Sequence, residues 1–373
     1  MSFRTRLIFA ILMPTALFFG FLHLFLPEST FNFERLHVFL FNLCSGGTII
    51  LYYTENKRRF SFRTISFLIL ALCFAIAAFL EVYAVSVVIA LVLAVIVDSI
   101  RIKAFSVFPV GFFRSSEPIF RKFHQASLLC LSIGLVLSSV VTVNNKFVQF
   151  VDLPKLNLDT FYLGFSFPVS LITMSVIFSM INESEAKIVR DFKEVGFWSV
   201  NLGVIIFFGF IIANVLIPQV VITLLLFASV IMILLLFYRF SKTMQQKSFL
   251  ISGLFFLLAS AITGIAYIIL EIVSVPDYNI LARVLRLHAF FSLYGWNLCG
   301  LTVICRFDDF PIKLHSNTII ATHWVTIVIA GTLGDHYPSM ALLSVAGYIV
   351  ILYQIFFSKG VGKRVAKPSP LGA

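Results

Sequence analysis

Long runs of apolar residues fill most of the chain and are separated by short polar segments. About twenty helical residues are needed to cross the roughly 30 Å hydrocarbon layer of a bilayer, and most of these runs approach that length. Two pairs of neighbouring runs have almost no polar residues between them, which predicts tight helical hairpins near residues 82 and 216. In all, the pattern predicts twelve transmembrane helices, at residues 7–26, 36–53, 65–81, 83–100, 126–144, 161–181, 198–215, 217–239, 248–272, 287–305, 318–334 and 339–357.

Basic residues fall very unevenly on the two sides of this topology. Lysine and arginine are concentrated in the cytoplasmic loops of membrane proteins. With a cytoplasmic N-terminus, few of the 28 lysines and arginines are left on the outer side, namely Arg35, Lys146, Lys155, Arg283 and Arg286. We therefore predict an all-α, polytopic membrane helix bundle with both termini in the cytoplasm. Residues 1–358 would form a single transmembrane domain, and residues 359–373 a short basic cytoplasmic tail.

The composition fits lipid as the solvent of this protein. Hydrophobic residues make up 60% of the chain and charged residues only 12%, against roughly 45–50% and about 25% in soluble domains. The net charge of +11 lies in short loops between apolar runs, so it reads as a topology signal and not as a nucleic-acid surface. We expect a multi-pass protein of the cell (inner) membrane whose partner is the bilayer; any membrane or periplasmic protein partner is unidentified.

Several ionisable residues lie near the outer ends of the predicted helices. They are candidates for function, because polar groups are costly in hydrocarbon and are kept where they are used. The helix centres hold almost no ionisable groups, so a polar site is expected toward the outer face. The candidates there are His23, His37, Glu81, Glu271 and His288.

Two of these residues belong to stretches that repeat each other. Arg35-Leu36-His37 precedes Asn42-Leu43-Cys44 at the second predicted helix, and Arg286-Leu287-His288 precedes Asn297-Leu298-Cys299 at the tenth. Both helices would run from outside to inside, so the two histidines lie at similar depth. The interval from histidine to asparagine differs by four residues, about one helical turn, so similar faces are still presented.

Paired histidines at matched depth suggest a cofactor or metal site. Two neutral imidazoles can serve as both axial ligands of a b-type haem, or as copper ligands. Arg35 and Arg286 could pair with the haem propionates. The competing interpretation is that histidine and arginine at a helix end lie in the headgroup region and bind nothing.

These features resemble a known family. Twelve helices, His37 opening the second helix with Gly46 and Gly47 a few turns on, and His288 opening a late helix that ends at Arg306 are similar to the NnrS-type haem- and copper-containing membrane proteins. More distantly they resemble the catalytic subunit of haem–copper oxidases. The resemblance implies haem binding and extends only to His37 and His288. The chain lacks the closely spaced histidine pair that an oxidase uses for copper, so proton-pumping oxygen reduction is not expected.

Three classes of function remain open from the sequence. The first is a haem- or copper-binding protein in redox or nitrogen-oxide metabolism, with no catalytic residue assigned. The second is a secondary transporter of a small molecule, in which the repeated stretches would mark related halves. They lie in helices two and ten instead of two and eight, which breaks a six-plus-six symmetry. The third is a membrane anchor or assembly subunit without chemistry or cofactor of its own.

Overall fold

The chain is helical throughout the part that the structure describes. The computed structural model describes residues 1–26, 31–57, 59–151, 162–182, 186–242, 246–273, 278–306 and 316–358. Within these ranges the only bridge of β type joins Ile181 to Ser241. The predicted all-α class is therefore confirmed. The predicted tail, residues 359–373, lies outside the described residues.

Eleven helices among the described residues are long and apolar enough to cross a membrane, and each matches a predicted span. The remaining predicted span, 161–181, corresponds to a shorter apolar helix at Gly164–Ser179, so the count of twelve crossings stays a prediction. The eleven are Phe3–Phe25 (α1), Phe33–Glu55 (α2, η1 and α3), Phe62–Phe79 (α4), Tyr83–Ala104 (α5), Ile119–Val148 (α6 and η3), Lys187–Ile212 (α9), Leu216–Phe240 (α10), Gln246–Ile272 (α11), Asn279–Cys305 (α12, η5 and α13), Asn317–Gly334 (α14, η7 and α15) and Pro338–Phe357 (α16).

Both predicted hairpins are present. The connection between α4 and α5 contains Glu81 at φ 59°, and that between α9 and α10 contains Asn214 at φ 55°. A left-handed residue at a helix end reverses the chain within a few residues and helps satisfy the last carbonyl groups. Asparagine tolerates this region better than most residues, whereas a glutamate there is less usual.

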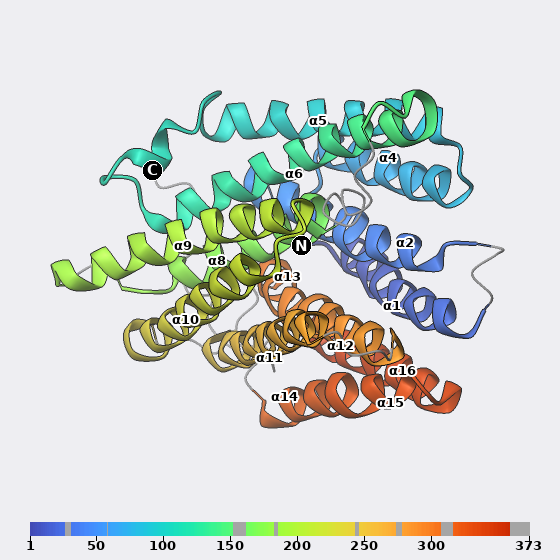
Figure 1. The fold of residues 1–373 in the computed structure, drawn as a ribbon. Coiled ribbons are helices and arrows are strands. Elements are labelled where there is room, and N and C mark those ends of the chain that lie inside the picture. Colours follow the sequence, from blue (N-terminus) through green and yellow to red (C-terminus); the bar gives the residue numbers. More distant parts are fainter. Residues whose placement is uncertain are drawn as a thin grey trace.

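The helices among the described residues form three consecutive units of four, which are joined in the same way; Figure 1 shows how they are arranged. The first unit contains α1 to α5, the second α6 to α10 and the third α11 to α16. The last helix of each unit packs against the first helix of the next: α5 against α6, α10 against α11, and α16 against α1. The third of these contacts closes the arrangement into a ring.

The second helix of each unit occupies the centre of this ring. The first and third units contribute Phe33–Glu55 and Asn279–Cys305, the two most buried of the eleven long helices. The second unit contributes η4 (Tyr162–Ser166) and α8 (Phe167–Ser179), which is buried along nearly its whole length. α8 contacts η1, η5 and α13, and α3 contacts α13.

All three central helices include π-helical turns before they continue as regular α-helix. The π segments are η1 (Phe39–Gly47), η4 and η5 (Phe291–Asn297), and the α-helical continuations are α3 (Thr48–Glu55), α8 and α13 (Leu298–Cys305). A π-helical turn widens the backbone and is common at functional sites. Other helices of the bundle carry such turns too, at η3 (Asn144–Val148) and η7 (Val325–Gly331).

Small residues allow the central helices to approach closely. A Cβ added to Gly46 would lie 2.5 Å from Cγ2 of Val169, and one added to Gly300 would lie 2.5 Å from Cβ of Thr173. Val169 and Thr173 are one turn apart on α8, so the two glycines pack on successive turns of one helix. Close glycine packing of this kind drives helix association in membranes.

Gly300→Ala is expected to destabilise the protein, because the added methyl group would overlap Thr173 and overpacking of a core costs about 1–3 kcal/mol. Gly209→Ala is the matched control. Apart from its chain neighbours and the nearby backbone of its own helix, no described atom lies within 4 Å of a Cβ at Gly209, and alanine is the better helix former by about 0.5–1 kcal/mol. Thermal unfolding in detergent should show a lower midpoint for the first variant only. Equal midpoints would contradict the packing described for Gly300.

Membrane orientation can be tested with cysteines introduced at exposed turns in a cysteine-free background. An impermeant maleimide should label cysteines at Gln149 and Asn214 in intact cells, and cysteines at Asn56 and Ala186 only after lysis. The distribution of basic residues predicts this pattern. Labelling of the Ala186 position in intact cells would show that the central helix α8 does not cross the membrane.

Candidate functional site

His37 lies on α2 (Phe33–Val38), directly before the π segment η1. Its imidazole is partly buried against α1: a Cβ added to Gly20 would lie 3.4 Å from the imidazole Cγ. The absence of a side chain at Gly20 thus makes room for the ring. The Nδ1 atom of His37 is buried, and the ring interacts with the backbone of Phe33 and Glu34, about one turn earlier in α2.

His288 lies at the matching place of the third unit, on α12 (Tyr278–Phe290) before η5. Its ring packs against α11, where a Cβ added to Gly264 would lie 3.0 Å from Nδ1. Nδ1 is 2.8 Å from the carbonyl oxygen of Ser260, and the Ser260 hydroxyl donates to the backbone carbonyl of His288. Because a carbonyl can only accept, Nδ1 carries the proton in the neutral ring and donates it. Nε2 then keeps a free lone pair, which is the form a metal ligand takes.

The two histidines have different neighbours but the same relation to their units. Each ring lies against a glycine of the first helix in its unit, which precedes the histidine helix and runs antiparallel to it. An aromatic contact links the two surroundings: the rings of Phe21, next to Gly20, and Phe290, two residues after His288, lie 5.7 Å apart. The structure thereby places an aromatic residue of α1 beside one that follows His288 on α12.

The arginine next to His288 is held by a carboxylate. Arg286 donates from Nε and Nη2 to the two oxygens of Asp335, at 2.7 and 3.0 Å. Arg283 also approaches this carboxylate, with its Nε 3.7 Å from Oδ2. The sequence did not predict this pairing, because a single aspartate in a loop gives no signal of its partner. The other predicted arginine, Arg35, lies in the first turn of α2, where its backbone N–H donates to the Asn32 side chain that caps the helix.

The remaining outer candidates are spread over three helix ends. His23, in the last turn of α1, approaches Glu34 on α2 with 3.7 Å between Nε2 and Oε2. Glu81 lies in the α4–α5 turn, and Glu271 in the last turn of α11. Within the described ranges, no three side chains of His, Cys, Asp or Glu gather as a metal-binding group.

Two further histidines, at the ends of the bundle away from His37 and His288, make hydrogen bonds to neighbouring helices. His124 Nε2 lies 2.8 Å from the Thr54 hydroxyl, which itself donates to the carbonyl of Ile50. His323 Nε2 donates to the carbonyl of Tyr294 at 2.9 Å. Both rings are fully buried and connect neighbouring helices.

A second polar site, which the sequence did not indicate, lies between the central helices. Asn42 Nδ2 donates to the Ser166 hydroxyl at 2.6 Å, and Trp296 Nε1 donates to the Ser170 hydroxyl at 2.7 Å. Asn297, next to Trp296, is fully buried. The available signal was the serine and threonine spacing in residues 166–173, which places hydroxyl groups on one face of a helix.

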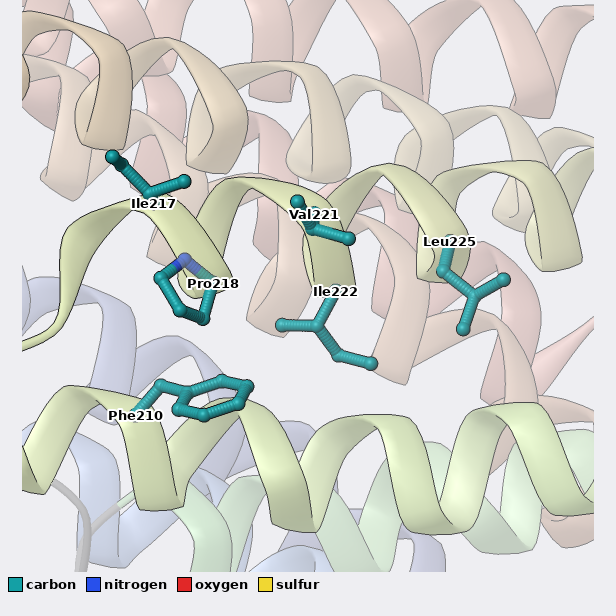
Figure 2. Close-up of a pocket in the computed structure, with 6 residues that line it drawn as sticks. All are labelled: Phe210, Ile217, Pro218, Val221, Ile222 and Leu225. Carbon is teal, nitrogen blue, oxygen red and sulfur yellow. The ribbon is translucent and has the colours of Figure 1, made fainter.

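A groove on the outside of the bundle has no polar lining group. It has a volume of about 570 Å³ and lies between α9 and α10 (Figure 2), lined by Phe210, Ile217, Pro218, Val221, Ile222 and Leu225. Ile217, Val221 and Leu225 are largely exposed. Such a surface suits lipid acyl chains and offers no group for chemistry.

The long apolar helices make this chain an all-helical, multi-pass membrane protein. Comparison with family models, with curated proteins and with solved structures finds no match. Any assignment of function therefore depends on the geometry of the residues themselves.

Proposed function

We propose that this protein binds a b-type haem, or failing that copper, through His37 and His288 near the outer face of the cell (inner) membrane. The observation that supports this most is the equivalence of the two residues. Each lies two or three residues before the π segment in the second helix of its unit, with its ring against a glycine of the preceding helix, although His288 lies much farther from the start of its helix than His37 does. Two imidazoles in equivalent places suit the two axial positions of one haem iron.

The hydrogen bonding of His288 also favours a ligand role. Histidines that bind metals commonly donate their other ring N–H to a carbonyl or carboxylate, which fixes the tautomer and the ring orientation. His288 donates from Nδ1 to the Ser260 carbonyl and presents Nε2.

The charges near His288 suit an anionic group. Arg283 and Arg286 share the single carboxylate of Asp335, which leaves an excess positive charge at this helix end. A haem propionate could join such a cluster through charge-assisted hydrogen bonds. A haem held there would supply one-electron redox chemistry, as a role in redox or nitrogen-oxide metabolism would need.

The absorption spectrum and metal content of protein purified in mild detergent test this proposal. Expression with ample haem and copper should give a protein with a Soret band and roughly one iron per chain, as two axial imidazoles per haem require. Copper in place of iron would support the second form of the proposal. A colourless protein free of both metals would overturn it.

A secondary transporter is the second candidate, and one observation favours it. The three central helices are interrupted by π turns where polar side chains meet. Transporters bind their substrates at discontinuous helices near the membrane midplane. Cysteines placed along these helices would then react from each side in turn as the protein changes state. An anchor or assembly subunit would show neither a cofactor nor such a change.

A further inference from the structure

The repeated sequence stretches contain a second matched pair that the histidine proposal does not use. Asn42 and Asn297 each begin an Asn-Leu-Cys motif, and both are fully buried inside the bundle. They stand on the central helices of the first and third units. A buried asparagine amide is costly in a membrane interior unless all its hydrogen bonds are made.

Both asparagines belong to helix faces that pack on α8. Asn42 donates to Ser166, and Gly46, one turn later, packs on Val169. Trp296 donates to Ser170, and Gly300, in the next turn, packs on Thr173. Asn297 lies three residues before Gly300, so it belongs to the side of the helix that carries Gly300 toward α8. The two amides therefore flank α8 from two neighbouring helices. We call Asn42, Asn297, Ser166 and Ser170 the α8 amide site.

The α8 amide site has hydrogen-bonding capacity that the described residues do not fill. The Asn42 Oδ1 atom and both the Oδ1 and Nδ2 atoms of Asn297 are buried and have no partner among them. The unfilled atoms include acceptors and a donor. Buried polar groups without a protein partner are normally satisfied by ordered water, which makes about three hydrogen bonds at such places.

The chemistry of the site favours an uncharged occupant. Its four side chains carry no charge, and an ion stripped of water in this position would lack a counter-charge from them. An occupant must both donate to the Oδ1 atoms and accept from Asn297 Nδ2. We propose that the α8 amide site binds ordered water molecules, which fill the buried amide hydrogen bonds of Asn42 and Asn297 in the interior of the bundle. This proposal is independent of haem or copper binding.

Hydroxyl-radical footprinting by X-ray radiolysis in ¹⁸O-labelled water tests the proposal on the full-length protein. Radicals formed from bound water oxidise the side chains beside it. Trp296, whose indole bonds to Ser170 and which is fully buried, should acquire ¹⁸O. Phe123 is equally buried but packs against the rings of Phe178 and Phe197, and it should stay unlabelled. Absence of label from both residues would show that the site is dry and overturn the proposal.

Substitutions make the test specific. Asn297→Leu should lower labelling of Trp296 several-fold, because the water loses its partner. Asn201→Leu is the matched control: Asn201 is a buried asparagine of α9 whose Nδ2 already donates to the Phe197 carbonyl, so labelling of Trp296 should not change. Equal labelling in both variants would contradict the assignment. Binding of radioactive sodium or potassium that Asn297→Leu abolishes would replace water with a cation and would also overturn it.

Discussion

His288→Ala is expected to abolish the haem absorption of the purified protein, and His37→Ala to do the same. In the proposed site each histidine is one axial ligand, so each substitution removes one of the two, and a b-type haem has no covalent link that would retain it through purification. Insertion into the membrane should be unchanged, because it is driven by the apolar residues and backbone hydrogen bonding of each helix. The measurement is the Soret absorbance per mole of protein, compared with the wild type. For the copper form of the proposal, the bound copper per chain is measured instead.

His124→Ala and His323→Ala are the controls for these variants. Both residues are engaged with neighbouring helices, through Thr54 and the Tyr294 carbonyl respectively. Their loss should lower thermal stability without removing the cofactor. Undiminished absorbance in His37→Ala together with loss of absorbance in His323→Ala would contradict the assignment. It would show that His323, and not His37, holds the haem.

Arg306→Met is expected to be the most destabilising single substitution that we describe. Arg306 is 2% exposed, and its guanidinium donates to the carbonyls of Ile355, Phe356 and Ser358 at the end of α16. A cation at the C-terminal end of a helix is also stabilised by the partial negative charge of the helix dipole there. Each hydrogen bond to a charged group is worth roughly 1.5–3 kcal/mol, so the loss should be about 3 kcal/mol or more. Thermal unfolding in detergent measures it.

Arg6→Met is the matched control for this prediction. Arg6, on α1, donates to the Phe356 carbonyl, which also accepts from Arg306. Because Arg306 still occupies this carbonyl in Arg6→Met, the loss of Arg6 should lower the stability clearly less. The two arginines join α1, α13 and α16 where the ring of units closes. If the two substitutions lowered the unfolding midpoint equally, Arg306 would not have the leading role that its buried contacts indicate.

The membrane helices could be predicted from the sequence because the signal for them is local. A bilayer requires apolar residues along the whole length of a crossing. Every long helix of the described residues corresponds to a predicted run, and the majority of the helix ends agree to within a few residues. Only α8, with its π-helical start at η4, is shorter than its predicted span. Its Pro168 lies in the first turn of the α-helix, a position where proline is favoured.

The arrangement of the helices could not be read from the same signal. Hydropathy does not say which helices are central, so nothing in residues 162–179 showed that α8 packs between two distant helices. The repeated stretches in helices two and ten break a six-plus-six symmetry. The two stretches fit an arrangement of three units of four helices, because helices two and ten are each the second helix of a unit. The roles of Asp335 and Arg306 could not be predicted either, since each depends on a partner far away in the sequence.

The claim that His37 and His288 hold one haem is tested most directly by the axial ligation of the iron. Near-infrared magnetic circular dichroism of the oxidised protein, recorded together with its electron paramagnetic resonance spectrum, distinguishes axial ligand pairs. The account predicts low-spin iron with two imidazole ligands, and high-spin iron in any His37→Ala or His288→Ala protein that retains haem. High-spin iron with a single imidazole in the wild-type protein would contradict it.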